Sequence, residues 1–258
     1  MRLSTLASIL LPCALLAQTA PSPEELIRRA NAATKAQFDR GWKYTFREDH
    51  TQMQVDKNGR AGPPTTDTYE HIMLEGGEYR RLILKDGKPL DAKTQKKVDD
   101  DLEKTRAERR KHSFLSSSHT VSLGGLDLLA LIFDNKVTGE ETVLGRTTWR
   151  MESEPKPGYK PANKAEEEAL ASRRVNWFDQ EDGFSIKSKD SFVRAVNTVQ
   201  PGTQIDWEWT KVGDDWLIGN TVMQADMKIV MGIHGRVESH QRFYDYKRFT
   251  VDSTMTPE

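Results

Sequence analysis

Three residues near the C-terminus are of types that bind metal ions: His234, Glu238 and His240. Their even spacing would place them on one face of a β-strand. Because a strand rises roughly 3.3 Å per residue, His234 and Glu238 would lie about 13 Å apart. Two ligands that far apart cannot share one ion unless a bulge at Gly235 brings them together, and Glu238 and His240 alone are an incomplete ligand set. We therefore expect no metal and no other cofactor.

The other residues that could do chemistry also lack the pattern that the chemistry needs. The acidic stretches 179–183 and 214–215 miss the alternating Asp and Asn ligands of a calcium loop, so they read as turns. The serine run 116–118 lacks the strand–turn–helix setting of a nucleophile elbow. The paired glycines are isolated and do not form a phosphate-binding loop. The sequence therefore predicts a protein that is not an enzyme.

The remaining candidate site is a set of large apolar side chains on predicted strands. Its members are Trp149, Met151, Trp177, Ile205, Trp207, Trp209, Met227, Ile229 and Met231. If they share the inner face of a sheet, they could line an apolar cavity, in which methionine re-packs easily around acyl chains. The alternative is an ordinary core beneath an N-terminal helix.

The elements that must position these side chains are short strands between residues 145 and 249. Apolar and polar residues alternate through most of this stretch, and turns rich in Gly or Asp interrupt it. Such alternation is typical of an antiparallel sheet with one dry face and one solvated face. Further strands are predicted at 42–55, at 67–74 and at 78–85, the last two forming a hairpin. The last strand is predicted at about 236–251.

Four helical segments are expected among these strands. A capping box at Ser22 to Glu25 predicts an amphipathic helix that ends near Asp39. The highly charged segment 91–112 predicts either a mobile lid or a surface helix held by ion pairs. Segment 126–133 is the most apolar run after residue 20 and reads as a short buried helix, with a strand as the alternative. The insertion 155–172 contains a helical piece at 164–172.

The N-terminus has the features of a secretory signal peptide. A basic start (Met1-Arg2) precedes an apolar run at 6–16, and small residues follow. We expect residues 1–20 to be a cleaved signal and residues 21–258 to be a single domain exported to the periplasm. Cys13 lies inside the apolar run behind a proline, which disfavours lipid anchoring there. It is the only cysteine, so its removal would exclude disulfides and thiol chemistry.

Composition restricts the partners. The 258 residues carry 38 basic and 39 acidic side chains, well mixed, for a net charge of −1. No basic stripe indicates nucleic acid binding. The chain is 30% charged, yet its 6 Trp, 9 Phe and 6 Tyr can build a core. We expect a monomer.

The order of these features resembles the LolA/LolB superfamily of periplasmic lipoprotein carriers. The resemblance is carried by the N-terminal helix, by residues 145–149 (Gly-Arg-Thr-Thr-Trp), by 176–179 (Asn-Trp-Phe-Asp), by Trp207-Glu208-Trp209 and by 215–217 (Asp-Trp-Leu). It implies an unclosed half-barrel of about eleven antiparallel strands, covered by helices, with a cavity for acyl chains and no catalysis. The insertions at 91–112 and 155–172 are larger than a minimal carrier needs.

Together these observations predict a mainly β fold with helices (α+β) and a non-catalytic exported protein. Its expected partners are lipids or lipoprotein acyl chains bound at the apolar set, with an envelope protein as a possible further partner. The alternative is a protein-interaction or envelope-sensor domain with a filled core and no small ligand.

Overall fold

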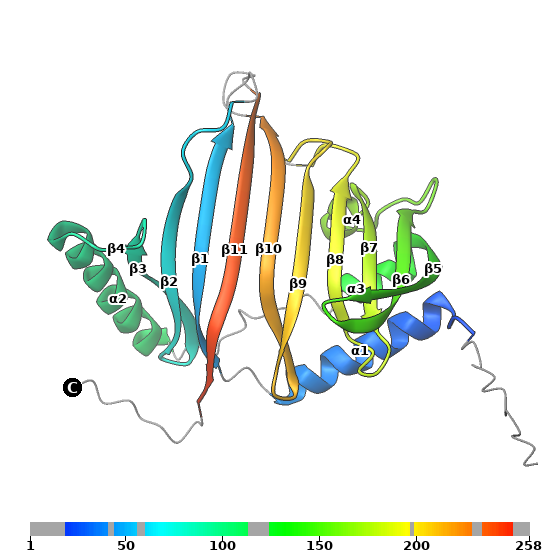
Figure 1. Ribbon diagram of the computed structural model, residues 1–258, viewed down its shortest axis with the longest axis horizontal. Helices are drawn as coiled ribbons and strands as arrows, with labels where there is room; N and C mark the ends of the chain where they lie inside the picture. The colour runs from blue at the N-terminus through cyan, green and yellow to red at the C-terminus, as the bar shows by residue number, and fades with distance from the viewer. Residues whose placement is uncertain are drawn as a thin grey trace, which may run out of the picture.

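The computed structural model describes residues 19–40, 44–55, 60–112, 124–196, 199–228 and 234–249. Within these ranges, eleven antiparallel strands form one unclosed sheet, and four helices lie against it (Figure 1). The sheet order is β4-β3-β2-β1-β11-β10-β9-β8-β7-β6-β5. The predicted fold class, a mainly β protein built on an unclosed sheet of about eleven strands, is confirmed.

One end of the sheet is made by the first strands of the chain. They are β1 (Tyr44–Val55), β2 (Thr65–Leu74), β3 (Gly77–Lys85) and β4 (Lys88–Pro89). The hairpin between β2 and β3 turns at Glu75 and Gly76, which both have positive φ (46° and 83°). Two positive φ angles are what a tight hairpin turn requires, and glycine adopts them without strain.

The other strands follow the middle of the chain and return to the centre of the sheet. They are β5 (Phe133–Val143), β6 (Arg146–Pro155), β7 (Ser172–Asp179), β8 (Ser185–Phe192), β9 (Gln204–Val212), β10 (Asp215–Lys228) and β11 (His234–Arg248). The last strand, β11, pairs with β10 on one side and with β1 on the other. The first and last strands are therefore neighbours in the middle of the sheet.

The helices gather at the two ends of the sheet (Figure 1). They are α1 (Pro23–Arg40), α2 (Ala92–His112), α3 (Gly124–Ile132) and α4 (Lys164–Ala169). In Figure 1, α1, α3 and α4 lie by the strands from β5 to β9, and α2 lies beside β3 and β4. None of the described helices is both long and apolar enough to cross a membrane.

Local chemistry explains where α1 begins and which side it buries. The Ser22 hydroxyl accepts a hydrogen bond from the Glu25 backbone N–H at 3.2 Å, as an N-cap does. Leu26, Ile27 and Ala30 recur at helical spacing and are buried. The main core forms where this side of α1 meets α3, α4 and the sheet. Its buried residues are Leu26, Ile27, Ala30, Leu129, Ile132, Phe133, Trp149, Met151, Ala169, Leu170 and Phe178.

The predicted elements differ from the structure in two places. No strand is predicted where β5 lies, because its residues are mostly polar and it is an edge strand with little to bury. The helix predicted at 164–172 ends at Ala169, because the Ala171 backbone N–H donates to the Glu168 carbonyl three residues back and Ser172 begins β7. The expected signal peptide and Cys13 fall on residues 1–18, outside the described ranges.

The pairing register defines two faces of the sheet. Residues directly opposite each other on neighbouring antiparallel strands project from the same face. The helix-side face carries Trp149, Met151 and Phe178, which pack in the core with α1 and α3. One row of directly opposed residues follows this face across the sheet: Met151, Asn176, Ser188, Trp207, Thr221, Gln241 and His50. The opposite side is called the open face below.

Candidate functional site

Two residues of the predicted apolar set are packed into the main core. Trp149 is 7% exposed and Met151 is 0% exposed, and both belong to the core that α1 and α3 cover. A ligand could not touch either side chain without moving a helix. At Trp149 and Met151, the helix-side face is therefore an ordinary packed core beneath helices.

Trp177 lies on the other face of the sheet. Its strand partner is Arg150, whereas the core residue Trp149 is opposite Phe178. The Trp177 indole N–H donates to the Glu141 carboxylate at 2.7 Å, and the Lys187 ammonium lies 5.7 Å from its ring centroid. Trp177 therefore does not join the helix-side residues; the smaller Phe178 takes the core position.

The three predicted residues of β9 share the helix-side face and are half-buried. Trp207 belongs to the row defined above, and Ile205 and Trp209 alternate with it. Trp209 packs against a second small cluster with Phe184, Ile186, Trp216 and Ala33. Met227 belongs to β10, whereas Ile229 and Met231 fall outside the described ranges. The structure thus brings together Ile205, Trp207 and Trp209 and keeps Trp177 apart from them.

The helix-side face of the central strands β1, β10 and β11 also carries apolar side chains. Its apolar side chains are only half-buried. They include Phe46 on β1, Met223 on β10 and Phe243 on β11. With Ile205 and Trp207 they make a half-buried apolar strip across four central strands. This set is named the central strip below, and Ile205 and Trp207 are its two members from the predicted apolar set.

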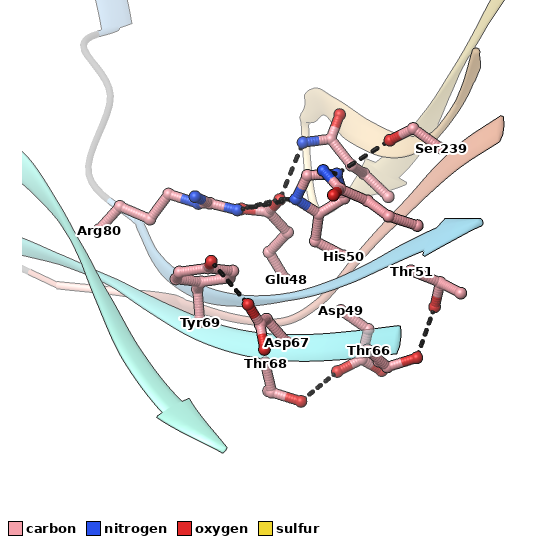
Figure 2. Close-up of polar contacts among 12 residues, drawn as sticks. Glu48, Asp49, His50, Thr51, Thr66, Asp67, Thr68, Tyr69, Arg80 and Ser239 are labelled. Carbon is pink, nitrogen blue, oxygen red and sulfur yellow. Dashed lines mark hydrogen bonds and ion pairs between the residues drawn. The ribbon is translucent and has the colours of Figure 1, made fainter. Parts of the chain in front are cut away.

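A buried charged cluster adjoins the central strip, and sequence reasoning missed it. Glu48 is 1% exposed, and its carboxylate accepts two hydrogen bonds from Arg80 (2.7 and 2.8 Å) and one from Gln241 (2.8 Å). The Arg80 guanidinium carbon also lies 3.3 Å from the centroid of the Tyr69 ring. Figure 2 shows Glu48, His50 and Arg80 on one side of β1, with Thr51, Thr66 and Thr68 on the other.

His71 links this cluster to a second carboxylate. Its Nε2 lies 2.8 Å from Glu48, and its Nδ1 is hydrogen-bonded to Glu78. A neutral imidazole has only one N–H, so two carboxylate partners favour the doubly protonated ring. Burial alone would lower the pKa of His71, but the hydrogen bonds to Glu48 and Glu78 outweigh it and raise that pKa. Phe46 stacks on the imidazole at 4.2 Å between centroids.

The electrostatics of this cluster suit a structural role better than acid–base catalysis. Burial would raise the pKa of Glu48, but the hydrogen bonds from His71 and Arg80 lower it to about 2. A general base works best with a pKa near the operating pH, and a carboxylate this acidic is a weak one. His50 joins the cluster through its Nδ1, which lies 3.3 Å from the Arg80 guanidinium and 4.0 Å from Glu48, while its Nε2 contacts Ser239 (2.9 Å) and Gln52 (3.0 Å).

The weak metal candidates of the sequence lie on the open face. His240 is opposite both Thr51 and Val222, and Glu238 is two residues away on the same strand face. These residues line a small groove of about 260 Å³. Among the described residues, no group of three His, Cys, Asp or Glu side chains is placed to hold a metal ion.

Comparison with known proteins finds similarity only at the level of solved structures. A domain described as an outer membrane lipoprotein-sorting protein domain from Vibrio parahaemolyticus is 9% identical, with a TM-score of 0.37, covering 88% of this chain and 95% of that one. A LolA superfamily protein from Nitrosomonas europaea is 7% identical, with a TM-score of 0.35 and coverages of 90% and 96%. The lipoprotein LppX from Mycobacterium tuberculosis is 11% identical, with a TM-score of 0.31 and coverages of 89% and 98%. No family model and no curated protein matches the chain.

Proposed function

We propose that this protein is a non-catalytic, exported binding protein that holds an acyl chain of a lipid or lipidated partner against the central strip. One observation carries the proposal. Half-buried apolar side chains, among them Phe46, Trp207 and Phe243, lie on the helix-side face of the central strands. Covering such side chains removes apolar surface from water, at roughly 25 cal/mol per Å².

The shape of the strip also fits an extended apolar ligand better than a compact one. Its members lie on β9, β10, β11 and β1, which span about 14 Å because neighbouring strands lie roughly 4.8 Å apart, and they are offset along these strands, with Thr221 and Gln241 across from Trp207. That length accommodates a large part of an acyl chain. The charged cluster of Glu48, His71 and Arg80 borders the strip at β1 and supplies a polar boundary.

The test compares two tryptophans on opposite faces. Trp207→Gln should weaken the binding of a fatty acid to delipidated protein about tenfold or more, because it places a polar amide in the strip. Trp177→Gln removes an indole of equal size from the open face and should leave binding within twofold. Binding is measured by displacement of an apolar fluorescent dye and by native mass spectrometry.

Two outcomes would reject this function. The first is a wild-type protein that neither carries lipid after purification nor binds the dye. The second is an equal effect of both substitutions, because binding would then not occur at the helix-side face.

A second candidate function is a protein-interaction domain without a small ligand. The observation in its favour is the packing of Trp149 and Met151 beneath α1 and α3, which fills one end of the face completely. If the dye finds no site in the wild-type protein, this candidate replaces the first.

A further inference from the structure

Five polar atoms on the helix-side face are buried without a hydrogen-bond partner in the described part of the chain, and three of them lie together on β6 and β7. These three are the Ser153 hydroxyl, the Nε of Arg174 and the Nδ2 of Asn176, and the other two are the Oδ1 of Asn135 and the hydroxyl of Thr221. Ser153 is 1% exposed and Asn176 is 6% exposed. Such atoms are uncommon in folded proteins, where nearly all buried polar groups are paired, so each one needs an explanation.

These three atoms come from two neighbouring strands and one face. Ser153 on β6 is directly opposite Arg174 on β7, and Asn176 is opposite Met151. Directly opposite residues have Cβ atoms roughly 5 Å apart, and alternate residues of a strand are separated by about 7 Å. The three side chains are thus close enough to contact one small group together.

The neighbouring side chains leave hydrogen-bond donors free. The Asn176 carbonyl oxygen already accepts from the Ser185 hydroxyl at 3.4 Å, so the unpaired end is the amide nitrogen. Arg174 lies 3.5 Å from the Asp190 carboxylate through an Nε that makes no hydrogen bond. Burial raises the pKa of Asp190, which weakens the attraction between its carboxyl group and the Arg174 guanidinium. Two nitrogen donors and a hydroxyl suit a ligand that presents hydrogen-bond acceptors, and the unpaired Oδ1 of Asn135, opposite Ser153 on β5, adds one acceptor beside them.

The register connects this position with the central strip. Arg174 is opposite Asp190, Asp190 is opposite Ile205, and Ile205 is opposite Met223. One row of the helix-side face therefore leads from the unpaired donors to the half-buried apolar residues. This juxtaposition of a polar end and an apolar path is what an amphiphile requires.

We propose that Ser153, Arg174 and Asn176 form an internal site that hydrogen-bonds the carbonyl oxygen at the head of an acyl chain. The chain itself would extend along Ile205 and Met223. This inference rests on the proposed function and adds the position of the polar head. The shared chemistry is a carbonyl acceptor, which either the carboxylate of a free fatty acid or the ester of an acylated lipid supplies.

The experiment titrates delipidated protein with palmitic acid and, separately, with methyl palmitate. Arg174→Gln and Asn176→Leu should each raise the dissociation constant about tenfold or more, the usual effect of losing a hydrogen bond to a polar ligand in a buried site. Arg173→Gln is the matched control, because Arg173 is the adjacent residue, points to the open face and pairs with Glu154 at 2.7 Å. The control should remain within twofold of wild type.

The two ligands separate the two sources. Weakening of both identifies the carbonyl as the recognised group, and weakening of palmitic acid alone identifies the free carboxylate. In ligand-free protein, Asn176→Leu should keep or raise the unfolding temperature, because it removes an unpaired buried amide. A fall in that temperature would show that the amide supports the fold and would overturn the assignment.

Failure of this inference is distinguishable from failure of the proposed function. If wild-type protein binds palmitic acid and the Arg174 and Asn176 variants bind it equally well, only the head-group site is wrong. If wild-type protein binds neither ligand, both proposals are wrong.

Discussion

At the scale of single residues, the feature that distinguishes this sheet is a histidine between two carboxylates. His71 holds Glu48 and Glu78 together inside the β1–β2–β3 end of the sheet. The two contributions to stability have opposite pH dependence. The stability that the Glu48 carboxylate contributes is fully present above its ordinary pKa of about 4.5, and it is lost as the pH falls toward the pKa of about 2 that Glu48 has in the folded protein. The stability that the protonated His71 contributes is fully present below its ordinary pKa of about 6.5, and it is lost as the pH rises through the higher pKa that His71 has in the folded protein.

The free energy of unfolding should therefore fall as the pH is raised from 6 to 9, and His71→Gln should remove that dependence. Each unit by which the folded pKa exceeds the unfolded one contributes about 1.4 kcal/mol. Urea denaturation at several pH values measures the free energy of unfolding. His240→Gln, on the open face, is the control and should keep the wild-type profile. A profile of the His71 variant that matches wild type would show that the imidazole does not titrate in this range.

The cluster could have been found in the sequence, and the reason it was not is physical. Phe46, Glu48 and His50 alternate along the first strand, so the same pattern that places Phe46 on the inner face places the two polar residues there. Glu is rarely buried unless it is paired, and its partners Arg80 and Gln241 are distant in sequence. Trp177 illustrates a related limit. The stretch Asn176-Trp177-Phe178 has two adjacent large aromatic residues, and only the cross-strand register decides which one faces the core.

At the scale of elements, the charged helix α2 is tied to the β2–β3 hairpin by Arg109, and the neighbouring Arg110 pairs with Glu75 in the hairpin turn. Arg109 donates hydrogen bonds to the carbonyls of Leu74, Gly77 and Glu78 at 2.7 to 2.8 Å. Other charged residues of α2, such as Lys96 and Asp100, form exposed pairs along the helix, and such pairs contribute little. The anchor favours the interpretation as a fixed surface helix over that of a mobile lid.

Arg109→Lys should loosen α2 without unfolding the sheet. A lysine is a point donor and cannot reach three carbonyls in the geometry of a guanidinium. Loss of about two hydrogen bonds, each contributing about 1 kcal/mol, should raise amide exchange in 92–112 roughly tenfold or more. Hydrogen exchange with mass spectrometry gives the rates. Arg110→Lys alters the adjacent exposed pair with Glu75 and should have little effect. Equal rates in both variants would mean that α2 is held by other contacts.

At the scale of the whole molecule, the strand pattern predicted the architecture well. Most strands have one buried side, which produces alternation of apolar and polar residues, so the antiparallel sheet and the hairpin β2–β3 follow from the sequence pattern. The number of about eleven strands came from the resemblance instead. The edge strand β5 could not be predicted from the pattern, because it buries few side chains and therefore shows little alternation of apolar and polar residues. The helical cover over particular strands also depends on tertiary packing, which is why the division into a filled end and a half-buried central strip needs the structure.

The adjacency of β1 and β11 has a consequence for how the chain acquires its structure. Their pairing joins residues almost 200 positions apart, such as His50 and Gln241. Closing so long a loop costs chain entropy before any contact is made, and folds rich in such contacts form slowly. The central pair cannot form until the last segment has been synthesised, so the nascent chain remains open until then. A chain that ends at Lys228 should therefore lose cooperative unfolding and become sensitive to proteolysis, whereas retained cooperativity would show that β1 and β10 fold without it. Late closure also extends the time in which the chain remains unfolded.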